Sequence, residues 1–516
     1  MPDPASLPLE LFDEILLFAM NGSMSSNPME ILRVSRAWHA VAIRHLYESY
    51  YFAPITEEPD ESENLVQFLG AVSKEKYGDL VRRLCIKLLG VDMLPKNVVA
   101  HLRESFKLWA QQAGLPNWKV DLYEGSPKFD VPSLVPLILT RVRNLRIAYL
   151  RLEHDSYYFS HALHAAVDPR NSSPFRAFQH LEKLQIGCHP GRGTPLAKFD
   201  FRVEDVWPLF HLPALKILAL DGLEARGAAR LLQEKRGQSP IENLNIAISG
   251  SLSRMTMSDV ETILQQPKSL KRLKIQFRQL PATYDGFVHG LWRSLVRYRD
   301  RLESLVIETI YAAWDDWDES KRPLQPYPCS PLATFPVLKQ LAISADYIVR
   351  NHGGCPHGGV SDLSLRGHLP PNLEAFMITD CSRALVLEGR LDPLLAHFVE
   401  ETTGMVKHIT IEGATIGSTA WDPIDFPLTE RACMRTGIQF DFHAYYDPHR
   451  VMIIHNPRWS PLVGTPDFRS DVRPAFYEEM ASACRCLRSV DNFDLLEEVY
   501  ERIAWRHLER PGLHLP

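Results

Sequence analysis

A short apolar pattern recurs along most of the chain and constrains its fold more than any other feature. A leucine or similar residue is followed three positions later by a second apolar residue and five positions later by a third, as in LKILAL (215–220). The second apolar position is held by Leu184, Leu218, Leu244, Leu273, Leu305, Leu341, Phe376 and Ile409. The successive gaps are 34, 26, 29, 32, 36, 35 and 33 residues. A sustained period of this length is typical of repeat architectures.

Each copy of the pattern predicts a short strand, because its apolar residues alternate. Helix-compatible segments lie between the copies, for example at 223–235, 258–267 and 284–301. One strand and one crossover helix per repeat predict a parallel sheet backed by helices, which is an α/β solenoid. The alternative is an ordinary α/β domain, but such a domain rarely keeps seven similar gaps, and no glycine-rich phosphate loop follows any of the strands.

Two earlier copies and one later copy extend the pattern. VRRLCI (81–86) and VRNLRI (142–147) place Leu84 and Leu145 at the second apolar position, with gaps of 61 and 39 residues on the way to Leu184. GIQFDF (437–442) is the candidate for a last strand. The whole series resembles leucine-rich repeats of an irregular kind. The asparagine or cysteine that the family carries eight residues after its first leucine is present only as Cys381.

The N-terminal segment has a different pattern. LPLELFDEIL (7–16) begins with a proline suited to the first helical position, and Asn27, Pro28 and Glu30 signal a second helix start. The segment lacks the basic start of a signal peptide and is too short to cross a membrane. Residues 6–52 are therefore expected to form about three helices, with a wide apolar face that a partner would complete.

These helices resemble the F-box, which docks on the Skp-type adaptor of cullin–RING ubiquitin ligases. The matching residues are Leu7, Pro8, Glu10, Leu11, Ile15, Leu16, Ile31, Leu32, Val34, Ser35, Arg36, Trp38, Val41 and Ala42. The resemblance implies that the adaptor is bound by Leu7, Pro8, Leu11, Ile15, Leu16, Ile31, Leu32, Val34 and Trp38. The loop between the first two helices is longer than usual, and Ser35 replaces a frequent cysteine. The alternative is a helical cap of the next domain.

The chain therefore divides into four parts: a three-helix F-box at 1–52, an acidic linker or loop at 53–79, a leucine-rich-repeat-like solenoid at 80–445, and a C-terminal loop with a helical cap at 446–516. The linker assignment rests on ITEEPDESEN (55–64), which holds five acids and no base. The cap would consist of two amphipathic helices near 474–488 and 492–507 that cover the open end of the solenoid.

Bulk composition excludes several functional classes. The formal net charge of -6 gives no pull toward nucleic acid or anionic membrane, and eight cysteines in 516 residues indicate reduced intracellular thiols. His352, Cys355 and His357 could approach a zinc ion, but a fourth ligand at regular spacing is missing, so a glycine-rich loop is the simpler interpretation. We expect no metal, no cofactor, and a location in the cytoplasm, the nucleus or both.

The predicted strands would align one polar row on the face away from the helices. From this row we select Arg272, Lys274, Gln276, Glu308 and His408 as candidate substrate contacts. Lys271, Arg272, Lys274 and Arg278 form a local basic strip that suits an acidic or phosphorylated protein segment.

The resemblance implies the substrate-recognition subunit of an SCF-type cullin–RING E3 ubiquitin ligase. The F-box would bind the Skp-type adaptor, the repeats would bind an unidentified protein substrate, and the chain itself would not be an enzyme. One alternative is an F-box scaffold that acts without ubiquitination. Another is a hydrolase with dispersed catalytic residues, although the sequence contains no known catalytic motif.

Overall fold

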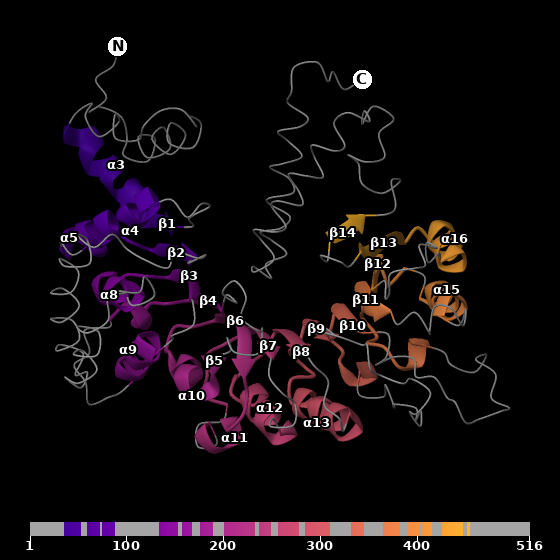
Figure 1. Ribbon diagram of the computed structural model, residues 1–516. Coiled ribbons are helices and arrows are strands. Elements are labelled where there is room, and N and C mark those ends of the chain that lie inside the picture. The colour runs from indigo at the N-terminus through magenta and orange to yellow at the C-terminus, as the bar shows by residue number, and fades with distance from the viewer. Residues whose placement is uncertain are drawn as a thin grey trace, which may run out of the picture. The chain divides into compact units, whose positions relative to one another are not determined.

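A computed structural model of the chain shows an α/β fold (Figure 1). The structure describes residues 36–52, 59–72, 75–87, 134–152, 157–167, 176–188, 201–232, 237–248, 256–277, 284–309, 332–344, 365–381, 391–402, 404–414, 426–446 and 451–454. They belong to two compact units. The first comprises Met1–Gly222, Arg230–Ile241 and Gln266–Lys268, and the second comprises Leu223–Ala229, Glu242–Gln265 and Ser269–Pro516.

The first unit is built on a parallel sheet. Its strands pair in the order β1 (Ser49–Phe52), β2 (Arg83–Lys87), β3 (Ile147–Leu152), β4 (Lys183–Cys188) and β6 (Ile217–Glu224), and the short β5 (Phe201–Arg202) pairs with β6. Its helical elements are α3 (Arg36–Glu48), α4 (Pro59–Val72), α5 (Glu75–Gly78), α8 (Leu134–Arg141), α9 (Tyr157–Val167), α10 (Val203–Val206) and the 3₁₀ turns η3 (Arg176–Gln179) and η5 (Trp207–His211). Helices α8, α9 and α10 lie on one side of the strands (Figure 1).

The second unit repeats this arrangement over more strands. β7 (Asn243–Ile248), β8 (Arg272–Phe277), β9 (Ser304–Thr309), β10 (Gln340–Ser344), β11 (Ala375–Cys381), β12 (His408–Ala414) and β13 (Gln439–Tyr446) pair in parallel in this order, and β14 (Val451–Ile454) is antiparallel to β13. The helical elements are α12 (Met257–Leu264), α13 (Tyr284–Val296), α15 (Leu391–Glu401), α16 (Pro427–Thr436), η8 (Leu332–Thr334) and η11 (Leu365–Gly367), and α11 (Ala228–Leu231) lies where the two units meet in the sequence. The four longer helices lie on one side of the strands (Figure 1).

The repeated apolar pattern forms buried rows across the sheet, as the sequence predicts. In the second unit Leu244 is paired with Leu273, Leu273 with Leu305, and Leu305 with Leu341. The row continues through Phe376, Ile409 and Phe440, and the side chains from Leu244 to Ile409 are at most 2% exposed. Burying this row supplies much of the hydrophobic stabilisation of the sheet. The α/β fold with sequential parallel strands is therefore confirmed.

The copy at 142–147 is out of register with the sequence prediction. Leu84 pairs with Ala148, and Ala148 pairs with Leu184, so Ala148 holds the second apolar position. Leu145 instead belongs to the first apolar position and is fully buried. The prediction was wrong by three residues because two overlapping triplets have the same apolar spacing: Val142, Leu145 and Ile147, and Leu145, Ala148 and Leu150. Only the pairing of β3 with its neighbours selects the second triplet.

The segment predicted as an acidic linker contains α4. Leu65, Phe68, Leu69 and Val72 recur at helical spacing and are buried, so this stretch is part of the core rather than a solvated loop. Pro59 begins the helix, and the acidic residues 60, 61 and 63 follow near its N-terminus, where the helix dipole favours negative charge. The acid-rich composition reflects the start of a helix.

Other boundaries also differ from the sequence prediction. The third predicted F-box helix, α3, ends at Glu48, and residues 49–52 form the strand β1. The helix predicted at 223–235 is reduced to the single turn of α11, whereas those predicted at 258–267 and 284–301 are confirmed as α12 and α13. A strand, β14, lies within the predicted C-terminal loop. The first two helices predicted for the F-box-like segment and the two predicted cap helices fall on residues outside the described part of the chain.

Side chains from one repeat satisfy the end of the preceding helix. The last carbonyls of a helix have no partner within it. The hydroxyl of Tyr298, after α13, donates to the carbonyl of Leu264 at the end of α12 over 2.8 Å. In the first unit, Gln266 Nε2 donates to the carbonyl of Leu232 over 3.0 Å from the equivalent position of its repeat. Burial raises the pKa of Tyr298 to about 12, so its hydroxyl stays a donor at neutral pH.

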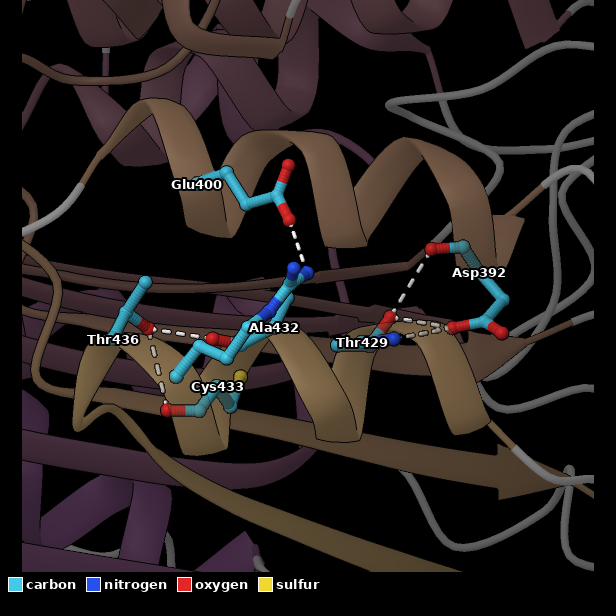
Figure 2. A network of polar contacts seen from close by, with 7 residues as sticks. Asp392, Glu400, Thr429, Ala432, Cys433 and Thr436 are labelled. Atoms are coloured by element: carbon cyan, nitrogen blue, oxygen red, sulfur yellow. Dashed lines mark hydrogen bonds and ion pairs between the residues drawn. The ribbon is translucent and has the colours of Figure 1, made fainter.

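Helix α16 is capped by a residue of α15 (Figure 2). Its own N-cap residue, Phe426, provides no side-chain acceptor. Asp392 Oδ1 accepts hydrogen bonds from Thr429 N at 2.8 Å and Thr429 Oγ1 at 2.7 Å, and Oδ2 accepts from Leu428 N at 3.0 Å. At the other end of the pair, Arg435 and Glu400 form an ion pair. Neighbouring repeats are thus joined by polar contacts at both ends of their helices.

Candidate recognition surface

The face of the sheet opposite the buried rows carries the predicted substrate contacts in the second unit. Arg272, Lys274 and Gln276 alternate along β8 with the buried residues Leu273 and Ile275. This alternation follows from the two-residue period of a strand. The sequence therefore predicted correctly that these polar side chains share one face.

Three of the predicted contacts form one polar group, called here the β8–β9 cluster: Lys274, Gln276 and Glu308. Gln276 lies directly opposite Glu308 in the strand register, and its Nε2 donates to Glu308 Oε2 over 2.9 Å. Lys274 Nζ lies 3.2 Å from the same oxygen. The side chains of Lys274 and Glu308 are only 14% and 13% exposed. Their charges are therefore engaged with each other. Gln276 is only 7% exposed, so the cluster is a preorganised and largely buried polar group rather than a set of free charges.

The predicted basic strip is not continuous. Lys271 is exposed at the start of β8, where its Nζ lies 2.7 Å from Glu242 Oε2. Lys274 belongs to the β8–β9 cluster, and Arg278 lies outside the described residues. Arg272 is exposed and is the member of the strip best placed to meet an acidic group. Among the three members of the strip that the structure describes, Lys271 and Lys274 meet carboxylates, and Arg272 is the candidate contact for an acidic or phosphorylated segment.

His408 belongs to a second polar group, called here the β12–β13 cluster: His408, Thr410, Gln439 and Asp441. His408 Nε2 lies 2.7 Å from Asp441 Oδ2 and 3.2 Å from Thr410 Oγ1, and Gln439 Nε2 donates to the same Asp441 oxygen over 3.1 Å. The side chain of His408 is 37% exposed. In a catalytic triad the nucleophilic hydroxyl and the carboxylate contact opposite nitrogens of the histidine ring. Here both meet Nε2, so Thr410 is not activated and the cluster is suited to binding.

Sequence reasoning selected His408 but missed its partners. Asp441 and Gln439 lie in the alternating segment QFDFHAYY of β13. The register places Gln439 opposite His408, and Asp441 opposite Thr410. Treating GIQFDF as a full member of the repeat series would have identified both residues. In the first unit, the same face carries Lys183, whose Nζ lies 5.2 Å from the centre of the Tyr149 ring, a cation–π distance.

A cavity of about 230 Å³ lies on the helical side of the second unit. Leu373, Phe398 and Val406 line it and are buried, whereas Arg366 and Met405 are exposed lining residues. It lies apart from the predicted contacts, and its apolar lining was not anticipated from the sequence.

The predicted adaptor contacts fall largely outside the described residues. Leu7, Pro8, Leu11, Ile15, Leu16, Ile31, Leu32 and Val34 precede α3, and Trp38 is described only as a backbone position within α3. His352, Cys355 and His357 also lie outside the described residues. Within the part of the chain that is described, no group of His, Cys, Asp and Glu could hold a metal ion, and no helix is long and apolar enough to cross a membrane.

Neither a scan against protein-family models nor a search of curated proteins matches this chain. The resemblance to the F-box and to leucine-rich repeats therefore rests on the residues themselves.

Proposed function

We propose that the protein is the substrate-recognition subunit of an SCF-type cullin–RING ubiquitin ligase inside the cell. The observation that carries the proposal is the order of two features: a segment that resembles the F-box, followed at once by an α/β repeat whose strands carry polar side chains on the face opposite the buried rows. The first feature would bind a Skp-type adaptor and the second a protein substrate. The contribution of the chain would be to raise the effective concentration of a substrate lysine near the transferring enzyme.

The connection between the two features supports this proposal. Helix α3 ends at Glu48 and strand β1 begins at the next residue, so no linker separates them. The carbonyl of Glu48 accepts a hydrogen bond of 2.8 Å from Arg82 N. Tyr47 stacks on Tyr77 with ring centroids 4.7 Å apart. Helix α3 is therefore joined directly to the strands of the first unit.

The polar face supports protein recognition rather than catalysis. The β8–β9 and β12–β13 clusters combine both signs of charge with amide and hydroxyl groups on ordered strands, which is the kind of surface that selects a complementary protein segment. Arg272 and His408 are the more accessible predicted contacts on it. We propose them as the first residues to test for substrate binding.

The decisive experiment is co-purification of the full chain with a Skp-type adaptor. Replacing Leu7, Pro8 and Ile15 together by Asp should abolish the complex, because charges would replace the apolar contacts of the F-box. The matched control is Leu428→Asp on the exposed face of α16, where the side chain is 43% exposed and the same chemical change should leave adaptor binding intact. Unchanged binding in the triple variant would reject the proposal.

The scaffold alternative predicts the same adaptor binding but no substrate whose ubiquitination depends on the chain. Comparing ubiquitinated proteins in cells with the intact chain and with the triple variant separates the two. A substrate receptor requires at least one protein whose ubiquitination depends on the intact F-box segment. An unchanged profile together with intact adaptor binding would favour the scaffold.

A further inference from the structure

One charged residue occurs at the second position of almost every repeat, and its sign alternates along the chain. The residues, in order, are Arg146, Glu182, Lys216, Glu242, Lys271, Glu303, Lys339, Glu374 and Lys407. The alternation has no exception from Arg146 to Lys407, whereas Arg82, which holds the same position before β2, is followed by Arg146 with the same sign. This set is called here the strand-edge charge ladder.

The structure places the members of the ladder side by side within each unit. Each member directly precedes the first residue of its strand. The carbonyl of Glu303, for example, accepts hydrogen bonds from Lys339 N at 2.8 Å and Gln340 N at 3.1 Å, and the carbonyl of Lys339 accepts from Glu374 N at 2.8 Å. Neighbouring members are therefore about one strand spacing, roughly 4.8 Å, apart along the backbone.

Several neighbouring members form ion pairs through their side chains. In the second unit, Lys271 Nζ lies 2.7 Å from Glu242, and Glu374 lies 3.0 Å from Lys339 Nζ and 2.6 Å from Lys407 Nζ. In the first unit, Arg146 lies 3.6 Å from Glu182. Lys407 and then Lys339, through hydrogen bonds, lower the pKa of Glu374 below its ordinary value, so this carboxylate interacts with a cation on each side.

Burial argues against a mainly stabilising role. The side chains of Lys339 and Lys407 are 60% and 72% exposed, and exposed ion pairs add little to stability because water screens them. A strict alternation would not be needed for stability, since any isolated opposite pair would contribute as much. The alternation also determines whether like or opposite charges meet when two strands pair.

Similar repeats can pair in the wrong order, which is a characteristic failure of repeat proteins. Every repeat here offers nearly the same apolar pattern, so the core does not distinguish one neighbour from another. If a strand paired with the next repeat but one, each contact in the ladder would join two like charges. Like charges directly opposite one another on paired strands are destabilising.

We propose that the strand-edge charge ladder specifies the order of the repeats. It favours pairing of each strand with its sequence neighbour and opposes pairing that skips one repeat. The ladder acts on competing arrangements during folding, in the manner of charges that select partners in other repetitive structures. It does not depend on the proposed function.

The test compares three variants of the full chain. The block variant, Lys271→Glu with Glu374→Lys, changes the order in the second unit to three Glu followed by three Lys at unchanged net charge. The reversed variant exchanges the sign of all nine members, five cations and four anions, so every alternation is kept while the net charge moves from -6 to -8. The neutral variant replaces the six members from Glu242 to Lys407 by Gln, which removes three charges of each sign.

The main readout is the fraction of chain recovered as folded monomer after dilution from urea. At low salt the reversed variant should match the original chain, the neutral variant should give less, and the block variant should give about threefold less or worse. In about 1 M NaCl, where the screening length is roughly 3 Å, the block variant should approach the original chain. A block variant that refolds like the original chain at low salt would overturn the proposal, as would a reversed variant that is impaired equally.

A second readout does not depend on refolding yield. The urea unfolding midpoint of natively purified protein should fall or stay level with added salt in the original chain and the reversed variant, and rise in the block variant. The neutral variant separates order from simple stabilisation: a lower midpoint with full refolding yield would mean that the ladder acts only through native ion pairs, against the proposal.

Discussion

The strand-edge charge ladder and the β8–β9 cluster are two ionic arrangements in the same sheet, and they differ in burial. Lys271 in the ladder is 46% exposed, whereas Lys274, three residues further along β8, is 14% exposed. Both lysines meet a carboxylate, at 2.7 Å and 3.2 Å. Distance alone would make the ladder pair the stronger one. Solvent reverses that order, because screening weakens an exposed pair far more than a buried one.

The comparison shows how one chemistry serves two purposes. An ion pair at the exposed strand edge costs little desolvation to form and adds little to stability. It can therefore favour one strand neighbour over another without contributing much to the free energy of folding. A pair on the nearly buried face has lost its hydration, so each charge depends on its partner.

Removing one charge of the β8–β9 cluster should be the most damaging change. Glu308→Leu leaves Lys274 and Gln276 without their shared carboxylate on a nearly buried face. We expect a loss of about 2–3 kcal/mol in the free energy of unfolding, below the full cost of a broken buried pair because some solvent remains. Urea unfolding at neutral pH measures it.

The matched control is Glu303→Leu, the same change at the exposed edge of the same strand. It should cost less than about 0.5 kcal/mol. A second variant isolates the cause: Lys274→Met added to Glu308→Leu should recover most of the loss, because no buried charge then remains. If the double variant is no more stable than Glu308→Leu, the damage comes from packing and the comparison fails.

Removing a charge from the ladder should have a smaller, salt-dependent effect. Glu374→Gln should lower the urea midpoint slightly at low salt, because Lys339 and Lys407 lose the carboxylate between them. The difference from the original chain should vanish in about 1 M NaCl, where exposed charges are screened. The effect of Glu308→Leu should persist in the same salt. Equal salt responses of the two variants would contradict the distinction drawn from burial.

The smallest effect concerns pH. The pKa of Glu374 is lowered in the folded chain, first by its hydrogen bond from Lys407 and then by that from Lys339. The unfolded chain therefore binds more protons near the ordinary value of 4.5, and the contribution of Glu374 is present above that value and lost as the pH falls through the lower folded pKa. The stability difference between the original chain and Glu374→Gln should narrow as the pH falls from 6 through the ordinary value of 4.5, and close below the lowered folded pKa. A difference that grows on acidification would contradict the sign.

Some elements were predictable from local pattern alone. The strands from β7 to β12 follow from the apolar period, and α12 and α13 follow from helical periodicity. The helix α4 was missed because its acid-rich start was taken for a linker, although Leu65 and Phe68 already show the helical spacing. The register of β3 was predicted wrongly because Leu145 can hold either the first or the second apolar position of the pattern. Only the pairing with β2 and β4 shows that it holds the first.

The candidate surface was predicted in part, for a similar reason. The alternation of apolar and polar residues along β8 is enough to predict from the sequence that Lys274 and Gln276 share one face. Their engagement with Glu308 depends on how β8 and β9 are aligned, and so does the meeting of His408 with Asp441 across β12 and β13. The residues in these contacts are more than 30 positions apart in the chain.

The sequence by itself determined that this chain forms repeated parallel strands and that opposite charges alternate at their edge, because both are periodic and can be read one repeat at a time. Only the tertiary structure decided which charges are exposed and which are paired on a nearly buried face. Burial and strand register are properties of neighbouring repeats together: the apolar rows hold the strands in alignment, and that alignment sets the surroundings of every polar side chain.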